Sequence, residues 1–234
     1  MPARLWSEFI TAGWLANPAF IRKQEAMTAM ERSDALTSLV VEYRSTTTAV
    51  ISDNLDRLPG AVGLRPYHLV RGTMAGRALT VRVAAGDNYY IHKALDLVQP
   101  GDVVVVDGDG STERALIGGI MSAIAKSRGA AGMVLNGAIR DTAEIGADDF
   151  PIFACGVTHR GPYKNGPGAI NVPVVIGGMI VNPGDIVVGD HDGVVAFPPQ
   201  NADKLLESVR AQERKEAEIF RQIAAGTYVG AYAK

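Results

Sequence analysis

The feature that most constrains the fold is an unbroken run of four valines, Val103 to Val106, with an aspartate at each end. A β-branched apolar run of this kind is typical of a strand that is buried on both faces of a sheet. A second apolar segment, residues 132–136, follows a stretch with helical patterning, and a third, residues 151–154, follows a shorter one. This β-α-β-α-β alternation predicts an α/β domain whose mixed central sheet is covered by helices.

The remaining elements are predicted from periodicity and turn residues. We expect a strand over residues 78–83 and helices over 46–58, 88–98, 112–128, 143–148 and 201–225. Between 156 and 198 the composition shifts to Gly, Pro and Val, which indicates short strands joined by tight turns. Pro-Gly-Asp precedes an apolar run at both 100–105 and 183–188. We interpret it as a common turn before a strand.

Three regions follow from this reading. Residues 1–45 are expected to form a helical N-terminal arm, because their apolar residues recur at helical spacing but are too few for a separate core. Within it, Ser33 and Asp34 are expected to cap a helix that runs to about Tyr43. Residues 46–198 form the predicted α/β domain. Residues 199–234 are expected to form a C-terminal helix and a tail.

Composition and charge exclude several classes of protein. The 234 residues include 25 acidic and 23 basic ones, with a net charge of -2 and no basic stripe, so neither nucleic acid nor an anionic membrane is an expected partner. A single cysteine, Cys155, excludes an intrachain disulfide framework. No apolar segment reaches the length of a membrane span, and the start lacks the pattern of a signal peptide. We therefore expect a cytoplasmic location by default.

The first candidate for chemistry is the pair Arg140–Asp141, which follows the C-terminal end of the predicted strand 132–136. Ligands of α/β proteins usually bind beyond the carboxyl ends of the strands. A guanidinium can bind a carboxylate through two parallel hydrogen bonds. An aspartate can bind a hard cation such as Mg²⁺ or Mn²⁺. Because an Arg-Asp dipeptide is common, a purely structural role stays open. The turn at residues 108–111 is expected at the same edge of the sheet.

The second candidate is Gly118–Gly119, inside the predicted helix 112–128. Two glycines destabilise a helix. They are explained if the backbone approaches a ligand, or if a helix begins there and offers free N–H groups to an anion. Close packing of the helix on the sheet is the alternative.

Other motifs give weaker signals. Residues 107–110 resemble a dinucleotide-binding loop, but the full glycine pattern is missing. The histidines show no metal-ligand spacing, so a zinc site is not expected, and we interpret His159 as a solvated loop residue. We expect Cys155 to pack as a small apolar residue.

Taken together, several motifs appear in a characteristic order. They are Gly86-Asp87-Asn88, the segment 100–108, Gly118-Gly119, Asn136-Gly137-Ala138-Ile139-Arg140-Asp141, Gly156-Val157-Thr158 and the segment 189–194. Over about residues 46–198 this set resembles the RraA-like family. That family includes the 4-hydroxy-4-methyl-2-oxoglutarate (4-carboxy-4-hydroxy-2-oxoadipate) aldolases.

The resemblance implies a swivelling β/β/α fold, a homotrimer or homohexamer with sites between subunits, and the chemistry of a class II pyruvate aldolase. Such an enzyme cleaves a 4-hydroxy-2-oxo dicarboxylic acid to pyruvate and a second keto acid, with oxaloacetate decarboxylation as a possible side activity. Arg140 would bind the pyruvyl carboxylate and keto oxygen, and Asp141 would hold Mg²⁺ or Mn²⁺. The substrate carboxylate would lie on the backbone N–H groups of Gly118, Gly119, Ile120 and Met121.

The chain also departs from the aldolase pattern. Aldolase members carry an acid where this chain has Gly119, and Asp87 or Asp109 would be the candidates to replace that carboxylate. An acid from the C-terminal helix of a neighbouring subunit is also expected near the metal, with Glu213 or Glu216 as candidates. Two other functions stay open. They are a non-catalytic binding protein, like the family members that inhibit an endoribonuclease, and another 2-keto-acid lyase or decarboxylase on the same scaffold.

Overall fold

The computed structural model describes residues 34–57 and 60–230. The chain divides into two compact units, 1–39 and 40–234. Residues 34–42 are helical, as expected, and a 3₁₀ turn covers Tyr43–Ser45. The rest of the predicted arm, residues 1–33, lies outside the described residues.

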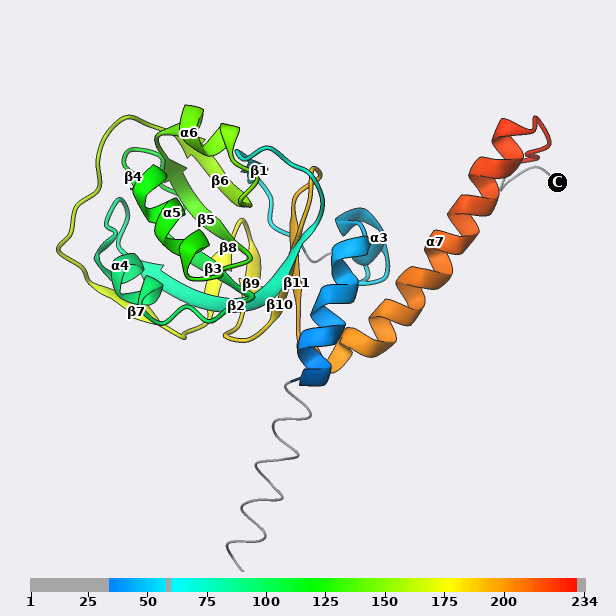
Figure 1. The fold of residues 1–234 in the computed structure, drawn as a ribbon, viewed down its shortest axis with the longest axis horizontal. Helices are drawn as coiled ribbons and strands as arrows, with labels where there is room; N and C mark the ends of the chain where they lie inside the picture. Colours follow the sequence, from blue (N-terminus) through cyan, green and yellow to red (C-terminus); the bar gives the residue numbers. More distant parts are fainter. Residues whose placement is uncertain (1–33, 58–59, 231–234) are drawn as a thin grey trace, which may run out of the picture. The chain divides into compact units, whose positions relative to one another are not determined.

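The second unit is built on a mixed nine-stranded sheet (Figure 1). Its centre is four parallel strands in the order β6-β5-β3-β2, and antiparallel strands extend it at both edges. The strands of this sheet are β1 (Arg65–Pro66), β2 (Met74–Val83), β3 (Asp102–Asp107), β4 (Ala115–Ile117), β5 (Gly132–Ile139), β6 (Ile152–Val157), β7 (Gly168–Ile170), β10 (Ile186–Gly189) and β11 (Val194–Phe197). Off the main path, β4 pairs with β5 and β7 pairs with β2.

Each face of the large sheet is covered by a different layer. Helices α4 (Tyr89–Leu95), α5 (Gly119–Ser127) and α6 (Thr142–Ala147) cover one face (Figure 1). The two-stranded sheet of β8 (Val174–Ile176) and β9 (Met179–Val181) packs on the other. The four valines of β3 alternate between the two cores, and each fully buried valine stabilises the fold by about 1.5 kcal/mol or more. The order is therefore β/β/α, which confirms the predicted α/β class.

A short helix near the start of the second unit packs on the long C-terminal helix. These are α3 (Thr48–Asp53) and α7 (Ala202–Ala224), and α7 confirms the predicted C-terminal helix. The Tyr43 hydroxyl donates to the carbonyl of Ala202 at 2.7 Å, and Asn54 Nδ2 donates to Gln212 Oε1 at 2.8 Å. The buried residues of α7 all lie in its first eight positions. None of the helices that the structure describes has the length and apolar character to cross a membrane.

One predicted element is wrong in its first half. The expected helix 112–128 begins only at Gly119, because Ala115–Ile117 forms strand β4. This strand pairs with β5 at Ala138 and Ile139, so hydrogen bonds to a neighbouring strand outweigh the helical pattern of its side chains. The same pairing extends β5 beyond the predicted end at residue 136. The other predicted helices and strands of the central sheet are present, with ends that shift by a few residues.

Candidate functional site

The Arg140–Asp141 pair lies where β5 leaves the sheet, as predicted. The Arg140 N–H donates to the carbonyl of Ile117 at 3.1 Å, which ties this point to the end of β4. Asp141 then adopts a left-handed backbone conformation, with φ 58° and ψ 37°. Among residues other than glycine, aspartate and asparagine adopt this conformation most readily. The turn starts α6 directly afterwards and brings the Asp141 carboxylate to the start of α5.

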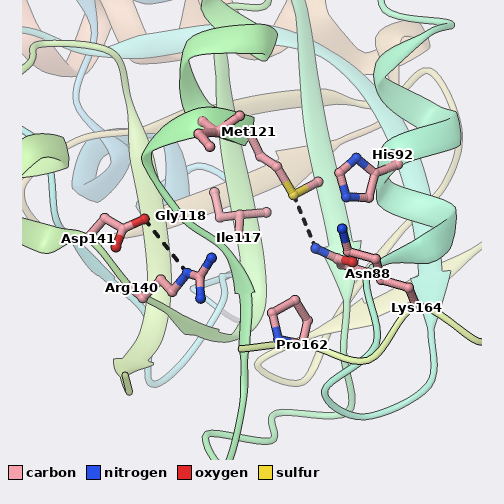
Figure 2. A pocket seen from close by; sticks show the side chains of 10 residues that line it. Asn88, His92, Ile117, Gly118, Met121, Arg140, Asp141, Pro162 and Lys164 are labelled. Carbon is pink, nitrogen blue, oxygen red and sulfur yellow. Dashed lines mark hydrogen bonds and ion pairs between the residues drawn. The ribbon is translucent and has the colours of Figure 1, made fainter. Parts of the chain in front are cut away.

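Gly118 and Gly119 form the start of α5, and the pair lies against this carboxylate. Oδ2 of Asp141 accepts the N–H of Gly119 at 3.0 Å and lies 3.7 Å from Nε of Arg140 (Figure 2). A Cβ on Gly118 would overlap with that oxygen and come within 3.0 Å of Cγ of Arg140. A glycine is therefore needed at residue 118 because the Arg-Asp pair lies against its backbone.

The first turn of α5 faces the same region. The N–H groups of a helix's first turn have no acceptor inside the helix and carry a partial positive charge. Asp141 takes the N–H of Gly119, so the helix start offers an anion the N–H groups of Ile120 and Met121. Two explanations were given for the glycine pair: the start of a helix and a close approach to the backbone. The structure shows a helix that begins at Gly119, and the groups that approach the backbone are the side chains of Arg140 and Asp141.

A pocket of about 180 Å³ opens beside these groups (Figure 2). Four segments line it: Asn88 and His92 from α4, Ile117, Gly118, Ile120 and Met121 from the β4–α5 corner, Arg140 and Asp141 from the end of β5, and Pro162 and Lys164 from the β6–β7 loop. Five of the six predicted site residues therefore line one pocket. The sixth, Gly119, is buried and does not line the pocket.

The loop that carries Lys164 is held in place by Asp87. This aspartate is buried, and its carboxylate accepts the N–H groups of Tyr89 at 2.8 Å, Asn165 at 2.6 Å and Gly166 at 3.0 Å. Since both of its oxygens are engaged, Asp87 does not supply the carboxylate that Gly119 lacks. Asp109 lies in the turn after β3, outside the pocket lining.

Three basic side chains and one acid line the pocket, which suits an anionic ligand. Across from Arg140 stand His92 and Lys164 (Figure 2). Burial lowers the pKa of His92, and the nearby Lys164 lowers it further, while Asp96 acts in the opposite direction. The imidazole is therefore neutral at neutral pH. His92 and Lys164 were not predicted as site residues. The available signal was the i, i+4 spacing of Asn88 and His92, which places both on one face of a predicted helix.

Asn88 joins the walls of the pocket. It is buried, and its Nδ2 donates to the carbonyl of Leu116 at 3.1 Å and contacts Sδ of Met121 at 3.2 Å. These contacts tie α4 to the β4–α5 corner. They hold α4, and with it His92, at a fixed position relative to Arg140.

The donor set of the pocket fits a hard, hydrated cation. The Asp141 side chain is 45% exposed, and in the described part of the chain its only hydrogen bond is to one of its two oxygens. Mg²⁺ in proteins typically binds one or two carboxylates and keeps several waters. The described residues contain no group of three or more His, Cys, Asp or Glu side chains that could hold a metal. A single carboxylate at the pocket mouth thus matches Mg²⁺ or Mn²⁺, and a protein-only zinc cage is not formed there.

The other motifs are structural or lie elsewhere. Asp107 accepts hydrogen bonds from the backbone N–H of Asp109 and from β8, so the turn after β3 joins the two sheets. His159 is exposed and lies outside the pocket lining. Burial raises the pKa of the Cys155 thiol, as expected of a packing residue. Glu213 pairs with Arg210 at 3.3 Å, and Glu216 accepts from Gln212 at 2.8 Å, both on α7.

Known proteins share this architecture and much of the sequence. The RraA-like family model, described as Aldolase/RraA, matches residues 48–196. A Halalkalibacterium halodurans protein named "Putative 4-hydroxy-4-methyl-2-oxoglutarate aldolase" is 37% identical over 193 residues, which cover 82% of this chain and 91% of that protein. A 4-hydroxy-4-methyl-2-oxoglutarate aldolase of Thermus thermophilus is 38% identical over 128 residues, 55% of this chain and 77% of that protein. The structure of the RNA-processing inhibitor RraA from Thermus thermophilus superposes with a TM-score of 0.60 at 33% identity, over 66% of this chain and 93% of that one.

Proposed function

Because the chain belongs to the RraA-like (Aldolase/RraA) family, we propose that it is a divalent-metal-dependent aldolase that cleaves a 4-hydroxy-2-oxo dicarboxylic acid into pyruvate and a second keto acid. Relatives named as aldolases at 37% and 38% identity make it a lyase of this family. The metal, the substrate and the residue roles are the proposal. One observation carries it: Arg140, the exposed carboxylate of Asp141 and a helix start with two free N–H groups line the same pocket.

The pyruvyl half of the substrate binds at the β5 end of the pocket. Its carboxylate accepts the N–H groups of Ile120 and Met121, where the helix dipole favours an anion. The Arg140 guanidinium lies beside this position and donates to the keto oxygen. As the C3–C4 bond breaks, the 4-hydroxyl loses its proton to water and becomes the carbonyl of the second keto acid, and the electrons of the broken bond form an enolate. Arg140 stabilises the negative charge that develops on the enolate oxygen, and protonation at C3 from water gives pyruvate.

Asp141 holds the cation, and the opposite wall holds the rest of the substrate. A bound Mg²⁺ or Mn²⁺ supplies Lewis-acid polarisation of the keto group. Asp141 is oriented for this role by the Gly119 N–H, which binds one carboxylate oxygen, and the other oxygen has no hydrogen bond within the described residues. Lys164 and His92 stand across the pocket, where the Lys164 ammonium attracts the second carboxylate of a dicarboxylic acid and the neutral His92 ring can donate a hydrogen bond to it.

The same enolate arises from decarboxylation of oxaloacetate, so this side activity belongs to the proposal.

The proposal also includes assembly of the chain into a trimer or hexamer. Beyond Val209, α7 leaves Phe220 and Ile223 exposed by 69% and 53%, and an adjacent copy of the chain can cover them. In such an assembly, Glu213 or Glu216 of the partner subunit would approach the cation.

Two other functions make different predictions. The RNA-processing inhibitor among the relatives suggests a non-catalytic binding protein, for which no pocket chemistry is needed. The presence of Arg140, Asp141 and the open helix start in one pocket favours the enzyme. A different 2-keto-acid lyase or decarboxylase would use the same pyruvyl site, and a panel of 2-keto acids with Mg²⁺ separates it from the aldolase.

The test is pyruvate release from 4-hydroxy-4-methyl-2-oxoglutarate, measured by coupling to lactate dehydrogenase. We expect release with Mg²⁺ or Mn²⁺, loss on chelation with EDTA and recovery when the metal is restored. Arg140→Ala and Asp141→Ala should each abolish release, whereas Arg160→Ala, on the exposed loop outside the pocket lining, should not. Release that survives both EDTA and the two substitutions would refute the assignment.

A further inference from the structure

The carboxylate of Glu144 lies against the backbone of Gly119. A Cβ built on Gly119 would overlap with Oε2 of Glu144 and come within 2.6 Å of its Cδ and 3.0 Å of its Oε1. The end of the Glu144 side chain therefore occupies the space that a side chain on residue 119 would fill. Any larger residue at 119 has to displace this carboxylate.

Glu144 reaches this position from the first turn of α6. It lies three residues after Asp141, which is the N-cap residue of α6. Its N–H donates to the carbonyl of Asp141 at 3.1 Å, so the two residues move as one turn. Asp141 contacts Gly118 and Gly119, and Glu144 contacts Gly119. Two carboxylates, from the N-cap and from the first turn of α6, therefore lie against the start of α5.

Nothing in the described part of the chain pairs with the Glu144 carboxylate. No hydrogen bond or ion pair of its side chain is formed there, whereas the nearby Asp148 accepts from Nζ of Lys126 at 2.6 Å. The dipole of α6 favours an acid in its first turn. That effect does not explain why the side chain is turned toward Gly119, because it holds for any rotamer in the first turn.

We propose that Glu144 is a positioning residue that supplies the second carboxylate of the cation site. Asp141 binds the cation directly, and Glu144 accepts hydrogen bonds from the waters that the cation keeps. From α6, Glu144 holds its carboxylate in the space that a side chain on residue 119 would enter, so it is the candidate for the role for which Asp87 and Asp109 were considered. This inference depends on the proposed function, because it concerns the same Mg²⁺ or Mn²⁺ site.

Mn²⁺ binding to the full-length protein tests this role without relying on turnover. Isothermal titration would compare the wild type, Glu144→Gln and the control Asp149→Asn, which removes a charge near α6 that pairs with Lys126. Loss of an outer-sphere partner typically weakens metal binding by about 10–100-fold, and we expect this for Glu144→Gln. Asp149→Asn should bind Mn²⁺ as the wild type does. Melting temperatures of the variants verify that each is folded.

A relocation variant makes the test specific to the space at residue 119. Gly119→Asp combined with Glu144→Ala moves the acid to α5 and should restore much of the Mn²⁺ affinity that Glu144→Ala alone loses. Wild-type affinity in Glu144→Gln, or no recovery in the folded double variant, would overturn the inference. If Asp141→Asn loses Mn²⁺ while Glu144→Gln keeps it, only this inference fails. If the wild type binds no Mn²⁺, the proposed cation site fails as well.

Discussion

The carboxyl ends of β3 and β5 are neighbours in the sheet, and an aspartate lies at each of them. The two aspartates differ in how their carboxylates are hydrogen-bonded. At the end of β3, Asp107 accepts from Asn136 Nδ2 at 3.2 Å and from the N–H groups of Asp109 at 3.1 Å and Val175 at 3.2 Å. Beyond β5, the Asp141 carboxylate accepts a single hydrogen bond from the described part of the chain, and the residue lines a pocket. An acid at a strand end is therefore not by itself a site. What distinguishes Asp141 is that its carboxylate is held by one oxygen only and opens to a cavity.

The largest expected effect is at the β5 end. Arg140→Lys keeps the positive charge but loses the planar guanidinium fork that donates to the keto oxygen. Because this donor faces the developing enolate, we expect kcat for pyruvate release to fall by about 10²–10³-fold. Steady-state kinetics measure the effect, and Arg160→Lys is the matched control. A kcat for Arg140→Lys near that of the wild type would show that the β5 end is no more important for catalysis than the β3 end.

Gly118→Ala should have the next largest effect. The new Cβ would displace the Asp141 carboxylate and the Arg140 stem, and a displacement of about 1 Å in a catalytic group can cost up to about 10²-fold in rate. The matched control is Gly146→Ala in α6, where a Cβ would meet only the carbonyl of Tyr67 at 3.5 Å. Kinetics and melting temperatures of the two variants give the comparison. Equal activity of both would show that the close contact at Gly118 does not position the site.

At the β3 end we expect a change in stability and not in rate. Asp107→Ala removes the acceptor of the Val175 N–H and one of the two acceptors of Asn136 Nδ2, which should lower the free energy of unfolding by about 0.5–1.5 kcal/mol. Urea denaturation measures this change. Below the midpoint of that transition, the folded variant should keep the wild-type kcat. A large loss of kcat in the folded variant would place β3 in the catalytic machinery and contradict the comparison.

The smallest expected effect is on the pH dependence of ligand binding. The pKa of His92 is lowered below its ordinary value of 6.5, mainly by burial, so the ring is neutral at pH 7.5 and gains its proton only at lower pH. A protonated His92 attracts the second carboxylate of a dicarboxylate. The Kd of 2-oxoglutarate should therefore decrease several-fold as the pH falls through the pKa of His92, an effect of about 1 kcal/mol. Titrations with His92→Gln should be nearly flat over this range, and an equal decrease of Kd in that variant would exclude His92 as the cause.

The sheet was predictable because its signals are local. The valine run of β3 and the apolar segments of β5 and β6 are buried on both faces, and such strands are recognised from composition alone. The β4 strand was not predictable in the same way. Residues 115–117 read as part of a helix, and only their pairing with Ala138 and Ile139 of β5 makes them a strand.

Only those residues of the candidate site that adjoin a recognisable strand or helix in the sequence were predictable. Arg140 and Asp141 follow a recognisable strand, and the glycine pair disturbs a recognisable helix. Lys164 reaches the pocket from a loop that Asp87 fixes through hydrogen bonds spanning 78 and 79 residues of the chain. Glu144 reaches Gly119 across the α5–α6 contact. Both placements depend on tertiary packing, which no spacing rule in the sequence encodes.

The central claim is that Asp141, beyond the end of β5, binds the cation and that Asp107, the last residue of β3, does not. Titration of Mn²⁺ into Asp141→Asn and Asp107→Asn, side by side with the wild type, tests this most directly. The account predicts wild-type affinity for Asp107→Asn and no detectable binding for Asp141→Asn. Mn²⁺ binding that persists in Asp141→Asn, or that is lost in a folded Asp107→Asn, would contradict it.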